Sequence, residues 1–287
     1  MLRNVLVTGG SGFIGSHIVD ALVKKKYNVT VVDLNSPKRK DVKFVKGSIL
    51  NKKLFKFLLK KNKLIFHLAA ISDINKVKNI PATTISTNVL GTARLIEASR
   101  KAKVKRFVFA STYYSYGNAG NLYTTSKIAS ELIIENYNLL FGLKYTILRY
   151  PTAYGPRNRN VDAISIFVDR AIKNKNLIIH GSGKQKRDYL HVEDLGEGSA
   201  IALDEKLVNK TVTLASKNSI KIIDLAKKII KLTKSKSKII LNNKKKRLDD
   251  FTSNQIYIKK KDYLSGWKPK YNLTSGLLQY IKYKKTK

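Results

Sequence analysis

Short apolar runs and amphipathic stretches alternate through the first half of the chain. The apolar runs are rich in β-branched residues and predict strands at Val5–Thr8, Val29–Val32, Lys43–Val45, Leu64–Leu68, Arg106–Ala110 and Tyr145–Leu148. The stretches between them have apolar residues at helical spacing and predict helices at Ile14–Lys25, Lys52–Leu59, Thr87–Arg100 and Ser126–Leu140. This alternation predicts an α/β protein of the Rossmann class, with a doubly wound parallel sheet and helices on both faces.

The pattern loosens after Pro151 into loops that contain glycine and lysine, with predicted helices at Ala163–Asn174, Ile222–Leu232 and Ser275–Tyr283. We therefore expect a cofactor-binding domain at residues 1–153 and a smaller, irregular α/β substrate lobe at residues 154–287. A segment near residues 188–205 is expected to return to the first domain. The second lobe should lie at the carboxyl ends of the strands, where open α/β sheets bind ligands.

A glycine-rich loop joins the first predicted strand to the first predicted helix, in Thr8-Gly9-Gly10-Ser11-Gly12-Phe13-Ile14-Gly15. Gly9 allows a sharp turn, Gly12 lets a diphosphate approach the backbone, and Gly15 lets the helix pack closely against the sheet. Free N–H groups at the start of the helix favour an anion. Similar loops often bind nothing, so the position between a strand and a helix is what makes this one informative.

An acidic residue ends the second predicted strand. Asp33 follows Gly15 by 18 residues, and a carboxylate at this place accepts hydrogen bonds from the ribose hydroxyls of NAD and repels a 2′-phosphate. The alternative is an acid that only caps a turn. Lys38, Arg39 and Lys40 follow closely and leave NADP open, but Asp33 favours NAD.

The fifth predicted strand ends in Ser111 and Thr112, and Tyr123 and Lys127 follow at the start of a predicted helix. Their spacing places the phenol and the ammonium on one helical face. The ammonium, together with a cationic nicotinamide, would lower the pKa of the phenol. Tyr123 could then remove a substrate proton near neutral pH, with Thr112 relaying it. The same spacing recurs at Tyr257, Tyr280 and Tyr283, which do not follow a strand-end hydroxyl.

The chain is strongly basic, with 57 Lys and Arg against 19 Asp and Glu among 287 residues and a net charge of +38. Such a surface attracts polyanions and predicts weak, non-specific binding of nucleic acid at low salt. The lysines are scattered and lack interleaved aromatic residues for base stacking. We therefore expect no specific nucleic-acid partner.

The chain contains no cysteine, which excludes disulfides, thiolate metal sites and a cysteine nucleophile. It has no apolar run of the length that a membrane span needs. The first predicted strand starts close to Met1 and leaves no room for a signal peptide. These features predict a cytoplasmic protein without a metal site.

Further motifs follow in order along the chain: His67-Leu68-Ala69-Ala70, Thr87-Asn88-Val89-Leu90-Gly91-Thr92, Ser111–Gly117, Leu148-Arg149-Tyr150-Pro151, Tyr154-Gly155-Pro156-Arg157, Gly181–Asp194 and Gly266-Trp267-Lys268-Pro269. With the glycine loop and the Tyr123–Lys127 pair they span nearly the whole chain. Together they resemble the extended short-chain dehydrogenase/reductase family, in particular its NAD-dependent nucleotide-sugar epimerases and dehydratases. The resemblance implies NAD as cofactor and a nucleotide sugar as substrate.

The resemblance also implies roles for single residues, with Thr112, Tyr123 and Lys127 catalytic. NAD would contact Gly9, Gly12, Phe13, Ile14, Gly15, Asp33, Ser48, Ile49, Leu68, Ala69, Ala70, Asn88, Tyr123, Lys127, Tyr150 and Pro151. The substrate would contact Thr112, Thr152, Arg187 and Arg247. The two arginines would bind its diphosphate, since a guanidinium meets phosphate oxygens bidentately. Asn88 would brace the active-site helix, although as a buried amide it could equally be only structural. His191, a metal-ligand candidate in isolation, is expected to make a structural hydrogen bond.

Two departures from the family pattern bear on the reaction. Ten residues separate Thr112 from Tyr123, fewer than the family usually has, which predicts a more open sugar pocket or a different sugar. Tyr113 and Tyr114 stand where the 4,6-dehydratases have an Asp-Glu pair, and the glutamate of UDP-glucuronate decarboxylases is also missing nearby. Without a carboxylate, neither elimination of water nor decarboxylation is favoured.

We therefore expect an NAD-dependent epimerase that inverts C4 of a UDP- or dTDP-hexose through a transient 4-keto intermediate. The alternatives within this fold are a 4-ketosugar reductase and a 4,6-dehydratase. An alternative of another class is a non-catalytic relative that senses dinucleotide and binds RNA, against which the complete set of Thr112, Tyr123 and Lys127 argues. The resemblance also suggests a homodimer through the helices at Thr87–Arg100 and Ser126–Leu140, and a product used for polysaccharide biosynthesis.

Overall fold

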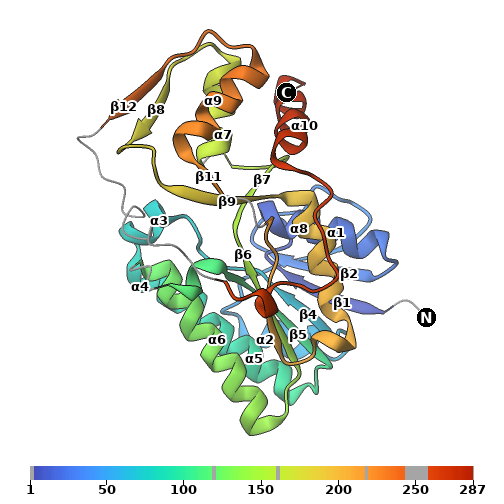
Figure 1. Ribbon diagram of the computed structural model, residues 1–287. Coiled ribbons are helices and arrows are strands. Elements are labelled where there is room, and N and C mark those ends of the chain that lie inside the picture. Colours follow the sequence, from blue (N-terminus) through green and yellow to red (C-terminus); the bar gives the residue numbers. More distant parts are fainter. Residues whose placement is uncertain (1–2, 118–120, 160–161, 217–218, 243–257, 287) are drawn as a thin grey trace.

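Seven parallel strands form the main sheet of the computed structural model, which describes residues 3–117, 121–159, 162–216, 219–242 and 258–286 (Figure 1). The strand order is β10-β6-β5-β4-β1-β2-β3, and every neighbouring pair is parallel. The strands are β1 (Asn4–Thr8), β2 (Asn28–Asp33), β3 (Lys43–Lys46), β4 (Leu64–His67), β5 (Arg106–Thr112), β6 (Tyr145–Tyr150) and β10 (Lys210–Thr213). The predicted doubly wound Rossmann fold is therefore confirmed.

Helices cover both faces of this sheet, which explains why its strands are continuous apolar runs. On one face α1 (Phe13–Lys24) and α8 (Val192–Ser199) pack over inward-facing side chains such as Val5 and Val7. On the other face α2 (Lys52–Leu58), α5 (Gly91–Lys101) and α6 (Leu122–Phe141) pack over alternate residues such as Leu6 and Ile65. Each face thus has its own apolar core.

Local sequence signals set the bounds of α6, the helix that carries the Tyr-Lys motif. Asn121 caps its N-terminus, where the side chain accepts a hydrogen bond from the backbone N–H of Thr124 at 2.9 Å. Gly142 ends it in the left-handed conformation, with φ of 66°, which favours glycine because it has no Cβ. The preceding helical segments are α3 (Ile74–Asn79), α4 (Pro81–Ile85) and a π-helical turn at Ser86–Leu90 that leads directly into α5.

The second lobe lies over one end of the main sheet and has a third apolar core. Its three-stranded sheet has the order β11-β9-β7, and β8 pairs in parallel with β12. Its elements are β7 (Thr152–Tyr154), α7 (Ala163–Ile172), β8 (Leu177–His180), β9 (Lys186–His191), β11 (Ser219–Lys221), α9 (Ile222–Thr233), β12 (Ile239–Asn242) and α10 (Leu273–Lys285). Short 3-10 turns lie at Tyr113–Tyr116, Ala200–Leu203, Glu205–Leu207 and Lys260–Asp262.

The chain returns from the second lobe to the first between α8 and β10. Residues 188–191 belong to β9 of the small sheet, whereas α8 packs on α1 and β10 pairs with β6. Leu190 already packs in the apolar core of the first lobe, and the pairing of β10 with β6 extends the return beyond residue 205. Among the described helices none has the length and apolar content to cross a membrane.

Candidate active site

A cavity of roughly 1210 Å³ opens between the carboxyl ends of the main-sheet strands and the second lobe. Successive strands run outward from β1 toward β3 and then, from β4, in the opposite direction. Loops that diverge at such a switch point leave the crevice in which α/β proteins bind nucleotides. All of the predicted cofactor residues line this cavity except Asn88.

The glycine loop packs too tightly for larger side chains. Gly9 has a φ of 73°, and a Cβ on it would lie 2.6 Å from the backbone nitrogen of Ala69. A Cβ on Gly15 would lie 2.1 Å from the carbonyl oxygen of Gly9. Gly12 is the N-cap of α1 and supplies no side-chain cap, so the start of the helix is open toward the cavity and suits a diphosphate.

Asp33 reaches the cavity from the end of β2. Its carboxylate accepts hydrogen bonds from the backbone N–H groups of Ser11 at 3.0 Å and Asn35 at 3.1 Å. Of the basic residues that left NADP open, Arg39 pairs with Asp41 and with Asp20, where Nη1 lies 3.0 Å from Oδ1. The Arg39 guanidinium is therefore already paired with two carboxylates, and Arg39 is not among the residues that line the cavity. This arrangement favours NAD.

The three predicted catalytic residues meet at the cavity wall. Thr112 ends β5, and Tyr123 and Lys127 lie in the first turns of α6. The Lys127 ammonium donates a hydrogen bond to the carbonyl oxygen of Ala110 at 2.7 Å and lies 5.9 Å from the centre of the Tyr123 ring. Strand β5 and helix α6 therefore place a hydroxyl, a phenol and an ammonium side by side.

Burial dominates the ionisation of this pair. Burial lowers the pKa of Lys127 to about 8, and the charge of Glu131 opposes the shift. The pKa of Tyr123 is raised, mainly by burial and further by Tyr114. This direction is opposite to the lowering predicted from sequence, which included a cationic nicotinamide beside the phenol.

A buried ion pair supports the catalytic helix one turn after Lys127. Glu131 accepts hydrogen bonds from Arg149 Nε at 3.1 Å and Nη2 at 2.5 Å, and also from the Ser111 hydroxyl. The Arg149 guanidinium lies 4.2 Å from the centre of the Tyr116 ring. These contacts tie α6 to the ends of β5 and β6. Sequence analysis assigned no role to Glu131.

Asn88 lies behind the cavity wall and is the one predicted cofactor residue that does not line the cavity. The π-helical turn directs its side chain inward, where Nδ2 donates to the Ile71 carbonyl and to Ser126 Oγ, both at 3.0 Å, and Oδ1 accepts from the Ile71 N–H at 2.8 Å. Fully engaged and buried, this amide braces α6 directly before Lys127. His67 is a second brace, bound to Thr8 at 2.7 Å and Thr92 at 2.9 Å.

Of the other tyrosines with a lysine four residues later, Tyr280 is the one whose pair is fully described, and it does not form such a site. Tyr280 lies in the apolar core of the second lobe, and the Lys284 ammonium pairs with Asp169 at 2.7 Å. Tyr257 and the partner of Tyr283, Lys287, lie outside the described residues. Spacing alone therefore does not identify the catalytic pair, and the strand-end hydroxyl is the deciding signal.

Besides Thr112, three residues were predicted to bind the substrate, and two of them line the same cavity. Thr152 and Arg187 line it from the second lobe, and Arg247 lies outside the described residues. Other polar lining residues were not predicted, among them Tyr114, Asn121, Asn158, Arg159, Asp162, Arg170, His180, Gln185 and Tyr189. Tyr114, Asn121 and Asp162 could have been found by position, because Tyr114 follows the end of β5 and the other two cap the starts of α6 and α7.

His191 makes a structural contact away from the cavity. Its Nε2 lies 3.2 Å from the Gln279 side-chain oxygen, and its ring centre lies 4.1 Å from that of Tyr271. Within the described part of the chain, no group of three His, Cys, Asp or Glu side chains is arranged to hold a metal ion.

The fold and the cavity define a Rossmann enzyme that binds a dinucleotide next to a Tyr-Lys pair. Residues 5–215 match the model of the NAD dependent epimerase/dehydratase family, and the chain belongs to that family. It is 33% identical to a putative UDP-glucose 4-epimerase of Methanocaldococcus jannaschii, over 98% of each chain. It is 34% identical to a UDP-N-acetyl-alpha-D-glucosaminuronate decarboxylase of Bacillus cytotoxicus, over 84% of this chain and 83% of the relative.

The structure is also similar to that of the Thermotoga maritima UDP-glucose 4-epimerase with UDP-glucose. The TM-score is 0.91, the identity is 29%, and 99% of each chain is covered. The family match confirms the predicted family and its NAD cofactor, and the relatives agree with that family. They include more than one reaction on UDP sugars, so the reaction must be argued from this chain's own residues.

Proposed function

We propose that this enzyme inverts C4 of a UDP- or dTDP-hexose. The proposal is carried by the composition of the wall around the reacting centre. Thr112, Tyr123 and Lys127 line it, while Tyr113 and Tyr114 stand at the positions of the acid pair expected in a dehydratase. The wall thus has groups for moving one hydroxyl proton and lacks, at those two positions, a carboxylate for eliminating water.

The protein's part in this reaction is to move a proton and to hold charge. Bound NAD supplies a hydride acceptor and, after reduction, a hydride donor. Tyr123 as phenolate removes the proton of the 4-hydroxyl in one direction and returns it in the other. The Lys127 ammonium stabilises that phenolate, and the Thr112 hydroxyl orients the substrate oxygen. A 4-keto sugar that presents its other face before re-reduction gives the inverted product, with no net redox change.

Arg187 would hold the nucleotide end of the substrate while the sugar turns. It lies on β9, lines the cavity and is 8% exposed. A guanidinium in such a position binds a diphosphate bidentately. Because the diphosphate is remote from C4, this contact can persist through both half-reactions.

The product identifies the reaction directly. We expect the purified protein, incubated with a panel of UDP-, dTDP-, GDP- and CDP-sugars, to yield the C4 epimer of a UDP- or dTDP-hexose. Product NMR checks this, with deuterium from solvent absent at C4 because the hydride is returned internally. Loss of water from the sugar, or steady consumption of NADH, would instead establish the dehydratase or the reductase.

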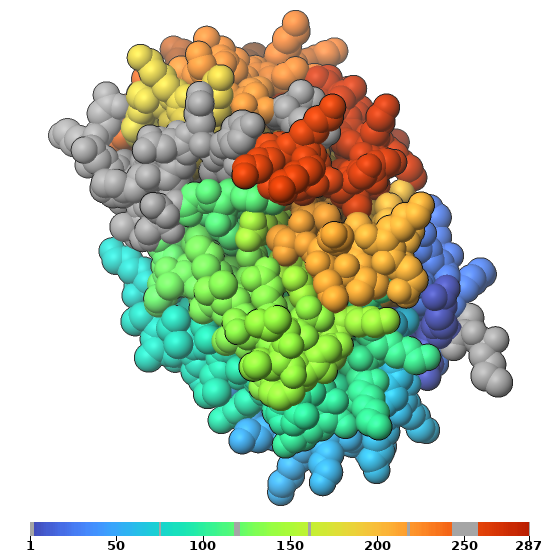
Figure 2. Space-filling view, turned by 60° about the horizontal axis from the view of Figure 1, so that its bottom comes forward, coloured from blue at the N-terminus to red at the C-terminus, as the bar shows by residue number. Residues whose placement is uncertain are grey.

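We also propose that the enzyme is a homodimer through α5 and α6. Large apolar side chains remain exposed on α6 and on the segment that precedes α5: Leu132, Leu139, Leu140 and Phe141 on α6, and Ile85 and Leu90 before α5. Leu132 and Leu139 share one face of α6, since they are seven residues apart. In Figure 2 the green segment that contains α6 lies uncovered on the surface. A second copy with the same face would cover it with a closed two-fold interface.

Replacing Leu132 and Leu139 together by Lys is expected to convert a dimer into a monomer, because four added charges would be buried across the two-fold axis. Light scattering coupled to size-exclusion chromatography measures the mass. Leu34→Lys is the matched control, because Leu34 is 63% exposed and lies outside these helices. A wild-type mass of one chain at micromolar concentration would contradict the proposal.

A further inference from the structure

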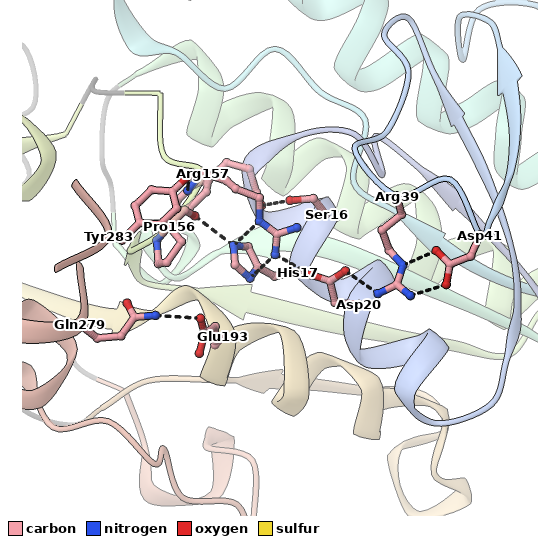
Figure 3. Close-up of polar contacts among 11 residues, drawn as sticks. Ser16, His17, Asp20, Arg39, Asp41, Pro156, Arg157, Glu193, Gln279 and Tyr283 are labelled. Carbon is pink, nitrogen blue, oxygen red and sulfur yellow. Dashed lines mark hydrogen bonds and ion pairs between the residues drawn. The ribbon is translucent and has the colours of Figure 1, made fainter. Parts of the chain in front are cut away.

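A loop of the second lobe is fastened along the cofactor-binding helix. The loop follows β7 and contains Gly155, Pro156 and Arg157 (Figure 3). The Arg157 guanidinium donates to Asp20 Oδ2 at 2.5 Å and lies against the His17 ring, with Nη2 2.7 Å from Nδ1. Both partners belong to α1, so the loop bridges the lobes at the helix whose N-terminus faces the cofactor.

The His17 ring lies between the Pro156 carbonyl oxygen and the Arg157 guanidinium. Its Nε2 lies 3.0 Å from the Pro156 oxygen and 3.0 Å from Arg157 Nε, and its Nδ1 lies 2.7 Å from Arg157 Nη2. Burial lowers the pKa of His17 to about 4, and the charge of Arg157 adds to the shift. The imidazole is therefore neutral near pH 7 and remains a stable acceptor for Arg157.

Arg157 adopts a left-handed backbone conformation at the point where its side chain contacts α1. Its φ is 69°, in the left-handed region that non-glycine residues seldom occupy. Its N–H donates to the Tyr283 hydroxyl at 3.3 Å, which adds α10 to the anchor. The turn fixes the direction in which the chain continues, toward Asn158 and Arg159.

Arg159 stands over the glycine loop. A Cβ on Gly12 would lie 3.8 Å from Arg159 Nη2, and both residues line the cavity. The Arg159 side chain is exposed, and it makes no hydrogen bond or ion pair with another described residue. The first turn of α1 carries no acidic residue. An unengaged guanidinium thus faces the helix N-terminus at which the diphosphate of a dinucleotide is held.

We propose that Arg159, a residue of the second lobe, binds the diphosphate of the cofactor, and that Arg157 is the positioning residue that directs it there. The cofactor would then be held by both lobes, with α1 on one side of the diphosphate and Arg159 on the other. Arg187 would serve the diphosphate of the substrate. Each of the two arginines, Arg159 and Arg187, would thus bind a different diphosphate. This inference rests on the NAD site and not on the reaction proposed above.

Binding by the full-length protein, freed of bound nucleotide, separates these roles without any assay of turnover. ADP-ribose probes the cofactor diphosphate, adenosine lacks it, and UDP probes the substrate end; isothermal titration calorimetry measures each. Arg159→Gln is expected to weaken ADP-ribose about tenfold, the size of one charge-assisted hydrogen bond. Adenosine and UDP should bind as before, and Arg159→Lys should recover part of the loss.

Arg100→Gln is the matched control. Arg100 lies on α5 outside the cavity and pairs with Glu97, so all three probes should bind unchanged. Arg157→Gln should weaken ADP-ribose without weakening adenosine, because Arg159 loses its direction. Unchanged ADP-ribose affinity in Arg159→Gln, or a loss confined to UDP or shared with adenosine, would overturn the proposal.

Discussion

Replacing Tyr123 by Phe is expected to lower kcat for the nucleotide sugar about 10³-fold, within the range for loss of a general acid-base group. The hydroxyl is the only part removed, and it is the group placed beside Thr112 and Lys127 at the strand end. Affinity for NAD should remain close to that of the wild type, because the glycine loop and Asp33 are untouched. Initial rates together with calorimetric titration of NAD check both parts.

Tyr280→Phe is the matched control for that variant. Tyr280 has the same spacing to a lysine, Lys284, but is 1% exposed in the second-lobe core. Its hydroxyl has no hydrogen-bond partner among the described residues, so its removal leaves no orphaned group and turnover should not change. Full turnover in Tyr123→Phe, or equal losses in both variants, would show that the phenol of Tyr123 does not carry the proton.

The sequence predicted the first lobe and its cofactor wall in detail because their signals are local. A strand, a glycine loop and a helix follow one another within the first 24 residues. Gly9, Gly12 and Gly15 each stand where a Cβ would lie close to a backbone atom. Tyr123 and Lys127 share one helix, and Thr112 ends the strand before it. The positions of these three residues at the end of one strand and the start of one helix were enough to predict that they lie at the same edge of the sheet.

The second lobe was harder to predict because its structure depends on pairings between distant segments. Strands β7 and β11 have three residues each, too short for an alternating pattern. The return to the main sheet is fixed by β10 pairing with β6, some 60 residues earlier. The position of Arg159 near Gly12 could not be predicted, because the motif that ends at Arg157 does not show the direction in which the chain continues after it.

The position of Asn88 behind the cavity wall also depends on a feature that the sequence pattern does not show. The residues around Asn88 have the spacing of an α-helix, and in a regular α-helix that spacing alone would determine the direction of each side chain. The π-helical turn at Ser86–Leu90 shifts the phase and directs the amide to Ile71 and Ser126. The residue before it, Thr87, lines the cavity instead. Asn88 therefore contributes through the helix that it braces.

Replacing Glu131 by Ala is expected to destabilise the protein by about 3 kcal/mol, because removal of one partner leaves a buried charge uncompensated. Glu131 is 3% exposed, and the Arg149 side chain that it pairs with is 17% exposed. Urea denaturation measures the free energy of unfolding. Glu97→Ala is the control: its pairs with Arg100 and Lys101 lie on the surface, and their loss should cost less than about 1 kcal/mol. Equal effects would contradict the role of the buried pair.

Glu131→Gln separates the charge of this residue from its packing. The carboxylate opposes the burial that lowers the pKa of Lys127 to about 8, so its neutralisation should lower that pKa further. Catalysis requires the ammonium, which is lost as the pH rises through the pKa of Lys127. The alkaline limb of kcat/KM against pH should therefore move to lower pH in Glu131→Gln and stay in place in the equally conservative Glu97→Gln. An alkaline limb that does not move would leave Glu131 with a purely structural role and would separate Lys127 from the pH dependence of the reaction.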